Sequence, residues 1–232
     1  MKRRTNFYLV SFVVVACMFV FLHFASCTHK DQTVPGGGGS NGGNIQRGDD
    51  QLGLGDGKTT FDKVHSSVNW ATAYLGGIAP LTGKFTTFGF NNFNFYESTP
   101  DSIYFEGFVY LNTNNTGEPG RDQGCMLGYL GTGAGAGYVD SNLAIISCKS
   151  KDVVFSTTDK GYIVTANLTF RGVTNSLTAK LDYVGKTDIG NGVNEYGFTL
   201  EFSFNALSDY GVPASGEIAD NVDVKCAANF KH

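Results

Sequence analysis

Histidine is scarce in this sequence, with four among 232 residues, and three of these lie near the two ends of the chain. Only His65 belongs to its central part. A zinc or similar metal site needs a second imidazole or closely spaced thiolates, which the sequence does not offer. A Ser-His-Asp triad would have to use His65, and the two serines after it lack the surroundings of a catalytic nucleophile. We therefore predict no metal ligand, no cofactor, no catalytic residue and no enzymatic activity.

Positive charge is also sparse. Lysine and arginine total 17 residues against 21 aspartates and glutamates. Lys2, Arg3 and Arg4 lie in a segment that we expect to be removed, which leaves 14 basic residues in an acidic chain. Such a chain lacks the basic patch by which proteins bind nucleic acids or anionic lipid headgroups. The sequence therefore predicts no nucleic-acid partner.

Cysteine is too sparse for a disulfide framework or a zinc motif. Two of the five cysteines lie within the first 27 residues, and the others are Cys125, Cys148 and Cys226. Their spacing matches neither metal nor redox motifs. A Cys125–Cys148 disulfide and buried free thiols are both compatible with the sequence. Cys226 alternates with apolar residues near the end of the chain, which indicates the inner face of a strand.

The one long apolar run lies at the start of the chain. Phe7–Leu22 follows the basic residues and precedes the small residues before Cys27. This arrangement is typical of a secretory signal. Its end is similar to a bacterial lipobox, with Phe24 where leucine is usual, and Cys27 would carry the lipid. An uncleaved membrane anchor is the alternative, because the run approaches the roughly 18 residues that span a bilayer.

Residues 1–27 therefore predict an exported protein that is held at a membrane. As a lipoprotein it would be anchored in the bacterial cell envelope, facing the periplasm or the cell surface. Residues 28–57 are polar and include the run Gly36–Asn44, GGGGSNGGN. They contain too few apolar residues to bury a core and predict a flexible tether between the anchor and a folded domain.

The longest patterned segment is Gly161–Gly185. Apolar residues alternate with mostly polar ones along Tyr162–Phe170, and the alternation resumes along Leu177–Tyr183 after a short polar turn. Successive strand side chains point to opposite faces, so this pattern predicts an antiparallel hairpin with one apolar face. One-faced antiparallel strands build barrels or sandwiches rather than parallel sheets.

Eight or nine such strands follow one another with turn residues between them. They are predicted at Ser66–Tyr74, Leu81–Phe95, Asp101–Thr113, Leu143–Ser147, Asp152–Thr157, Tyr162–Arg171, Ser176–Val184, Tyr196–Asn205 and Asn221–Phe230. Short connections between many strands favour an all-β, up-and-down antiparallel barrel, with a sandwich as the alternative.

The hairpin, with its turn LTFRGVT at Leu168–Thr174, resembles a segment of the YceI-like, polyisoprenoid-binding family. Three further segments agree with that family in order and spacing, at Phe61–Trp70, Leu81–Phe95 and Phe202–Val212. The resemblance covers residues 58–232. It implies an eight-stranded, lipocalin-like barrel and, as the ligand, an isoprenoid lipid such as a quinone or a polyprenol. An eight-stranded barrel is wide enough either to be filled by side chains or to hold one slender ligand.

The segment Gly117–Gly137 departs from the family pattern. Arg121 and Asp122 match an Arg-Asp pair of the family, but glycine-rich sequence replaces the short helix that follows it there. We therefore expect no helix to cover this end of the barrel. A mobile lid loop and an ordinary surface insertion are both compatible with the sequence.

Aromatic residues dominate the predicted interior. The positions expected to line a ligand tunnel are Trp70, Phe85, Phe105, Val109, Leu168, Phe170, Leu181, Phe202 and Phe204. Pocket walls are mainly apolar and aromatic, but alternation alone does not distinguish a tunnel from a solid core. At a tunnel mouth, His65, Tyr74 and Arg121 are candidates for contacts with a ligand headgroup.

The resemblance favours the tunnel. We predict a membrane-tethered carrier that holds an isoprenoid lipid without chemical change. The alternative is a structural or adhesive surface module whose barrel is filled by its own side chains. Whether the chain forms a homodimer is left open by the sequence.

Overall fold

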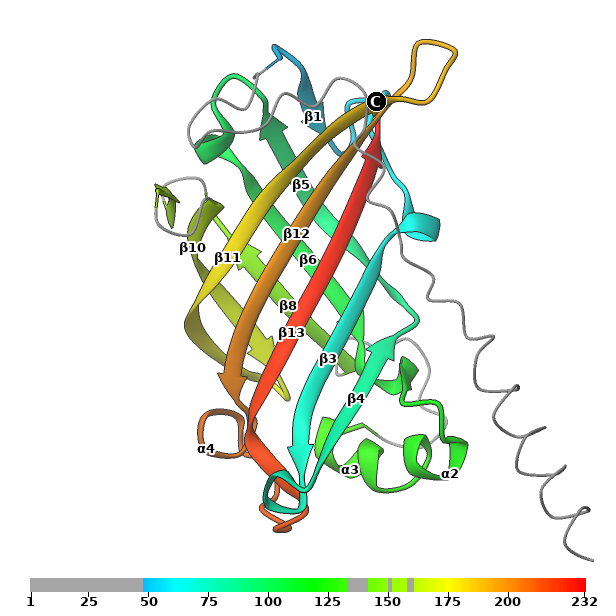
Figure 1. Ribbon diagram of the computed structural model, residues 1–232, viewed down its shortest axis with the longest axis vertical. Coiled ribbons are helices and arrows are strands. Elements are labelled where there is room, and N and C mark those ends of the chain that lie inside the picture. Colours follow the sequence, from blue (N-terminus) through cyan, green and yellow to red (C-terminus); the bar gives the residue numbers. More distant parts are fainter. Residues whose placement is uncertain (1–47, 133–141, 150–151, 158–160) are drawn as a thin grey trace, which may run out of the picture. The chain divides into compact units, whose positions relative to one another are not determined.

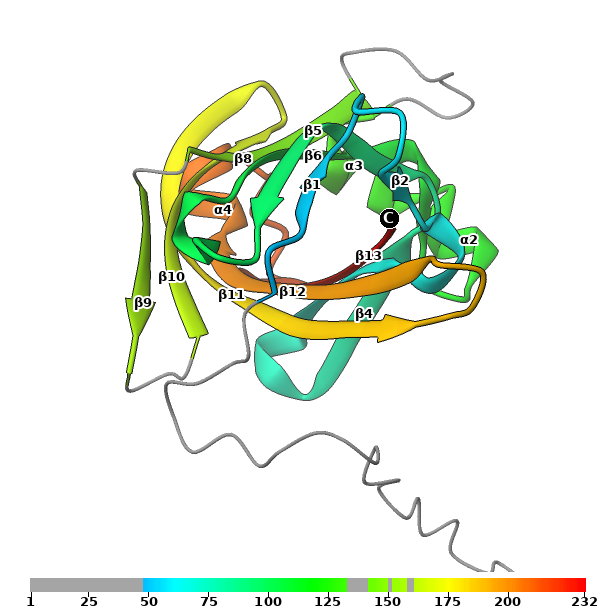
Figure 2. The same ribbon diagram turned by 90° about the horizontal axis from the view of Figure 1, so that it is seen from above.

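The computed structural model describes residues 48–132, 142–149, 152–157 and 161–232. The predicted signal, the lipidation candidate Cys27 and the tether up to residue 47 lie outside the described residues. The part of the chain that is described forms one antiparallel sheet of 13 strands, which curls around a central space (Figures 1 and 2). This architecture confirms the predicted all-β fold and its up-and-down arrangement.

The pairing follows the chain through β5, β6, β8, β10, β11, β12 and β13, and β13 also pairs with β3, which pairs with β4. The strands are β1 (Gln51–Gly53), β2 (Thr60–Phe61), β3 (Ser67–Tyr74), β4 (Ala79–Phe85), β5 (Phe88–Tyr96), β6 (Tyr104–Tyr110), β7 (Asn114–Asn115), β8 (Leu143–Cys148), β9 (Val153–Ser156), β10 (Gly161–Phe170), β11 (Val173–Asp188), β12 (Asn194–Asn205) and β13 (Ile218–Lys231).

One predicted strand, Leu81–Phe95, is two strands in the structure. β4 pairs with β3, β5 pairs with β6, and only Thr86 and Thr87 lie between them. Hydrogen bonds from the Thr86 amide to the Thr113 carbonyl and from the Tyr110 amide to the Thr87 carbonyl hold this bend. β4 and β5, each next to the last strand at its end of the sheet order, are thus consecutive in the chain. The sheet of the described residues has 13 strands, whereas the resemblance implied eight.

The predicted hairpin is confirmed residue by residue. β10 and β11 pair from Tyr162 opposite Leu181 to Phe170 opposite Val173. The turn between them places Arg171 and Gly172 in the left-handed region, at φ 52° and 78°, which suits glycine and is uncommon for arginine. Arg171 is held there because its guanidinium donates hydrogen bonds to the carbonyls of Gly128 and Tyr129.

The end of the predicted tether belongs to the barrel, which corrects the boundary at residue 57. β1 pairs with the end of β5, where Leu52 lies opposite Phe95 and is fully buried. Three residues are too few to show an alternating pattern, and the glycines around Leu52 are typical of a linker. The buried leucine is therefore the reason that this segment is ordered against the sheet.

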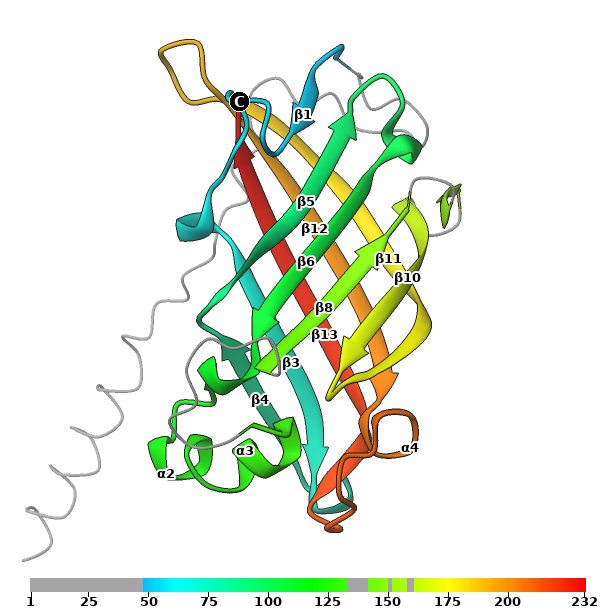
Figure 3. The same ribbon diagram turned by 180° about the vertical axis from the view of Figure 1, so that it is seen from behind.

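Short helices cover one end of the barrel, where no helix was expected. The α-helices are α2 (Pro119–Asp122), α3 (Cys125–Leu130) and α4 (Ala206–Tyr210), and the 3-10 helices are η2 (Lys63–His65), η3 (Leu75–Gly77), η4 (Pro100–Ser102) and η5 (Leu111–Thr113). α2, α3 and α4 lie at the same end, which we call the helical end (Figures 1 and 3). Among the described residues, no helix has both the length and the apolar character needed to cross a membrane.

The expectation about Gly117–Gly137 was therefore wrong for its described part. Met126 and Leu130 are spaced four residues apart in α3, so they share one face of the helix, and both are buried. This pair fixes the helix to the barrel despite the surrounding glycines. The rest of the predicted lid loop, from residue 133 onward, lies outside the described residues.

Aromatic side chains fill the opposite end of the barrel, near the end of β13. Phe93 and Phe230 stack with ring centroids 3.8 Å apart, and Phe95 contacts Phe198 edge to face at 4.9 Å. Such contacts add about 0.5–1.5 kcal/mol each beyond the burial of the rings. We call the following residues the aromatic plug: Phe61, Phe90, Phe93, Phe95, Tyr183, Phe198 and Phe230.

Candidate functional site

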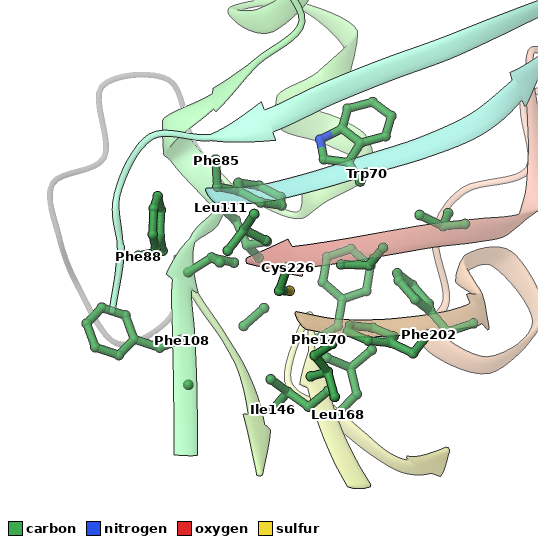
Figure 4. Close-up of a pocket in the computed structure, with 18 of the residues that line it drawn as sticks. Trp70, Phe85, Phe88, Phe108, Leu111, Ile146, Leu168, Phe170, Phe202 and Cys226 are labelled. Atoms are coloured by element: carbon green, nitrogen blue, oxygen red, sulfur yellow. The ribbon is translucent and has the colours of Figure 1, made fainter. Parts of the chain in front are cut away.

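A cavity occupies the barrel between the aromatic plug and the helical end. The volume open to the centre of a water-sized sphere is about 180 Å³. A single water needs only about 10–15 Å³ of such space, so the cavity has room for a multi-carbon ligand. Figure 4 shows Trp70 and Phe85 on one side of the cavity, Phe170 and Phe202 on the other, and Cys226 between them.

All nine positions predicted to face a tunnel line this cavity, among other residues. They are Trp70, Phe85, Phe105, Val109, Leu168, Phe170, Leu181, Phe202 and Phe204. The alternation therefore predicted the inward face correctly. Whether these side chains contact a ligand belongs to the proposal below.

Local structure explains how the largest of them is oriented. Trp70 on β3 lies opposite Gly83 on β4, and a Cβ at Gly83 would lie 2.5 Å from the indole ring. Glycine at this position is what lets the ring lie against the strand. The indole N–H donates a hydrogen bond of 2.8 Å to the Asn114 side-chain oxygen, and the Asn114 amide donates to Asp122. The ring is thus fixed from both sides.

Several lining residues escaped the sequence analysis because they lie outside the strands. Met126 and Leu130 come from α3, Leu111 from η5 and Val212 from the loop after α4. The i,i+4 spacing of Met126 and Leu130 was a usable signal for an amphipathic helical turn. Leu111 lay in the predicted strand Asp101–Thr113, on the same parity as Phe105 and Val109, and this alternation was its signal. Val212 gave no comparable signal, since single apolar residues in loops are common.

The cavity wall is almost entirely apolar. The polar groups that its lining residues carry are the hydroxyls of Thr72, Tyr129 and Thr199, the Trp70 N–H and the Cys226 thiol. The Tyr129 hydroxyl donates to the Glu217 carboxylate and accepts from the Ser215 hydroxyl, and the Thr72 hydroxyl donates to the Asn221 carbonyl at 2.7 Å. Burial raises the pKa of the Cys226 thiol to about 12, so it is uncharged at neutral pH. The wall therefore suits an apolar, uncharged occupant.

A partly buried charged network lies beyond the aromatic plug. Glu97 is 1% exposed, accepts a hydrogen bond of 2.6 Å from the Tyr183 hydroxyl and pairs with Lys186 at 2.8 Å. Lys186 also pairs with Asp50, which accepts a bond from the Tyr196 hydroxyl. Burial and the hydrogen bond to Glu97 raise the pKa of Tyr183. Burial alone would lower the pKa of Lys186, but its bonds to Asp50 and Glu97 raise it overall.

None of the three headgroup candidates lines the cavity. His65 lies in η2 on the outside of the barrel, where its Nδ1 is 2.8 Å from an Asp62 oxygen. Tyr74 ends β3 and is 38% exposed. Arg121 lies in α2 and donates from Nε to the Thr116 hydroxyl. The structure does not bring these side chains together.

Asp62, His65 and Glu195 form the one group of potential metal ligands found among the described residues. Lys231 occupies this group, because its ammonium lies 2.6 Å from the Asp62 carboxylate. The Lys231 ammonium thus supplies a positive charge at the position that a metal ion would take. Hydrogen bonds from Lys231 and His65 hold the pKa of Asp62 well below its usual range.

This pairing predicts a dependence of stability on pH. Because the folded state lowers the pKa of Asp62, its contribution is fully present above the unfolded value of about 3.9 and is lost as pH falls through the folded value. We expect the free energy of unfolding to decrease below about pH 4 and Asp62→Asn to flatten this decrease. Denaturant unfolding between neutral and acidic pH measures it. The exposed Asp101→Asn is the control, and an equal effect of both variants would contradict the assignment.

The Cys125–Cys148 disulfide that the sequence left open is not formed. Cys125, Cys148 and Cys226 are all free thiols. Cys125 begins α3 and is exposed, whereas Cys148 ends β8 and is buried, so the two belong to different environments. Buried small hydrophobes, the second alternative, describe Cys148 and Cys226.

An antiparallel barrel with an apolar cavity is the architecture of small-molecule binding barrels. The YceI-like domain matches residues 60–230, and the chain therefore belongs to the YceI-like family. This result confirms the resemblance on which the sequence analysis relied. No sequence among curated proteins matches the chain.

Solved structures share the fold at low sequence identity. The chain is similar to BcnA from Burkholderia cenocepacia, with 16% identity and a TM-score of 0.55 over 73% of this chain and 99% of that one. It is similar to the YceI protein of Campylobacter jejuni, with 15% identity and a TM-score of 0.52 over 66% and 85%. A polyisoprenoid binding domain from Saccharophagus degradans, implicated in plant cell wall breakdown, has 16% identity and a TM-score of 0.48 over 75% and 97%.

Proposed function

We propose that this protein binds an isoprenoid lipid in the barrel cavity and carries it without chemical change. The observation that supports this most is the cavity itself, which is large enough for several carbon atoms and almost free of polar groups. Hydrocarbon chains need such a wall, because each unpaired polar group facing them would remain unsatisfied. Membership of the YceI-like family supports an isoprenoid as the hydrocarbon.

Energetics limit how tightly the ligand is held. Removing a methylene from water contributes about 0.8 kcal/mol, so an isoprene unit of five carbons contributes about 4 kcal/mol. The tail of a lipid in a bilayer is already out of water. The free energy of its transfer from the bilayer into the cavity is therefore close to zero. The aromatic plug closes one end, so the tail lies with its tip toward the plug and its headgroup toward the helical end. A quinone or polyprenol type of ligand fits this orientation.

A membrane tether would aid such a carrier. We propose that Cys27 is lipidated and that the protein is exported and anchored in the bacterial cell envelope. A chain of about 20 residues between Cys27 and residue 48 has a root-mean-square span of roughly 25 Å if it is flexible. The barrel would then remain close to the bilayer, which raises the frequency of lipid encounters.

The test is to identify the bound lipid. The full-length protein, purified from a bacterial membrane fraction, is extracted with organic solvent, and the extract is analysed by mass spectrometry. We expect an isoprenoid in near-stoichiometric amount. A quinone added to stripped protein should also quench the emission of Trp70, the single tryptophan of the chain, which lines the cavity. An extract without lipid, together with unchanged emission on adding a quinone, would favour the structural or adhesive module instead.

A further inference from the structure

The connection between β3 and β4 forms an exposed apolar tip at the helical end of the barrel (Figures 1 and 3). Within five residues, Ile78 is 83% exposed, Leu75 44% and Tyr74 38%. Single exposed apolar residues are ordinary on soluble proteins, but a cluster at one protruding turn marks an interaction surface. We call residues 74–78 the apolar tip.

Backbone geometry holds the apolar tip in place. Leu75 adopts φ 46°, an uncommon conformation for a non-glycine residue, and Gly76 and Gly77 follow with φ 66° and 98°. The Leu75 amide donates a hydrogen bond of 2.7 Å to the Glu217 carbonyl, which anchors the turn to the residue before β13. The exposed leucine is therefore maintained by the fold at some cost in strain.

The hairpin that carries the tip has an unusual composition. No lysine, arginine, aspartate or glutamate lies between Lys63 and Lys84, although such residues make up 16% of the chain. Charged side chains are strongly unfavourable within the hydrocarbon of a bilayer, whereas tyrosine is favoured at its boundary with water. An uncharged hairpin with leucine and isoleucine at its turn and tyrosine just behind them matches the surface of a bilayer.

The apolar tip is continuous with the cavity wall. Tyr74 lies opposite Ile218, and Ile218 lines the cavity. The Tyr129 hydroxyl, whose ring also lines the cavity, donates to the side chain of Glu217, the residue that holds Leu75. A surface that touches the tip would therefore lie beside α3, the helix that covers the cavity.

The neighbouring charges define which surface fits. Asp209, Asp220 and Glu217 lie at the helical end, and the guanidinium of Arg171 is already bound to backbone carbonyls. An acidic surrounding is repelled by anionic lipids. We propose that the apolar tip inserts into the surface of an uncharged, zwitterionic lipid bilayer, so that the helical end of the barrel faces the membrane. This inference goes beyond the proposed function, because it assigns a membrane-contacting surface that requires no particular ligand.

Depth-dependent quenching tests this assignment on the full chain, with or without its lipid anchor. The single tryptophan is removed by Trp70→Phe and a new one is placed by Ile78→Trp. Vesicles contain phosphatidylcholine with brominated acyl chains, which quench tryptophan that reaches the hydrocarbon, or the same lipid without bromine. We expect a blue shift on adding either vesicle and a loss of emission only with the brominated lipid. Replacing part of the phosphatidylcholine by anionic phosphatidylglycerol should weaken both effects.

The matched control is Val64→Trp in the same background, because Val64 is 86% exposed but lies in η2, away from the tip. It should show neither effect. Equal quenching of both variants, stronger insertion into anionic vesicles, or a blue shift of Ile78→Trp that depends on protein concentration without vesicles would each overturn the proposal. The last result would identify a second copy of the chain as the occupant.

If Trp70→Phe weakens the fold, Trp70 is retained, since its emission is common to both variants. A chain with an empty cavity can still show the expected insertion, so this outcome is separate from that of the lipid extraction.

Discussion

Replacement of Cys226 by phenylalanine is expected to abolish lipid binding while the barrel remains folded. The Cys226 side chain points into the cavity between its two aromatic walls (Figure 4). A phenyl ring would occupy the space that the ligand needs. Loss of contact with only two methylenes corresponds to about 1.6 kcal/mol, which already exceeds a tenfold change in affinity. We expect the amount of co-purified lipid to fall by at least about tenfold.

Two further variants distinguish exclusion of the ligand from damage to the fold. Cys226→Ala enlarges the cavity and should retain the lipid, and Cys125→Phe places the same ring at an exposed position in α3. The added ring fills existing space, so the free energy of unfolding should change by no more than about 1–3 kcal/mol. Lipid extraction and quenching of Trp70 by a quinone are the measurements. Full lipid content in Cys226→Phe would show that the ligand, if present, lies elsewhere.

Removal of the Glu97 side chain is expected to cause the largest loss of stability. Glu97→Ala leaves the buried Tyr183 hydroxyl without its acceptor and Lys186 with only one of its two carboxylates. Breaking a buried ion pair from one side costs about 3–5 kcal/mol. The lower part of this range applies because the Lys186 side chain is 33% exposed and keeps Asp50. We therefore expect a loss of about 3 kcal/mol.

Denaturant unfolding checks this value against two references. Glu97→Gln retains an acceptor for Tyr183 and should cost less than Glu97→Ala. Glu201→Ala removes a surface ion pair of 2.5 Å with Lys225, whose partners are 44% and 66% exposed, and should cost less than about 1 kcal/mol. A loss in Glu97→Ala no larger than that in Glu201→Ala would mean that the charged network beyond the aromatic plug contributes little.

The strands were predictable because burial on one face imposes alternation. Tyr162–Phe170 shows this best, since β10 pairs on both edges and buries every second side chain. The bend between β4 and β5 was also readable in principle. Phe85 and Phe88 both face inward but are three residues apart, which a regular strand does not allow, and this odd spacing marks the break.

Other features depended on contacts that alternation does not record. β1 is ordered by a single buried leucine at the edge of β5, and α3 by two apolar residues among glycines. The nine cavity positions were predictable as an inward face, but not as the wall of an open space. Whether facing side chains meet depends on the diameter of the barrel and the lengths of the opposing side chains, which are properties of the assembled sheet.

The position of β13 has a consequence for how the chain reaches this state. Trp70 lies opposite Val224, and the ladder between β3 and β13 joins residues that are 144 to 160 positions apart in the chain. Proteins dominated by such distant pairings fold slowly, on the order of milliseconds to seconds, because a large loop must close before the pairing is rewarded. Until β13 arrives, β3 and β12 keep unpaired edges. Until the barrel closes, these open edges expose the chain to aggregation.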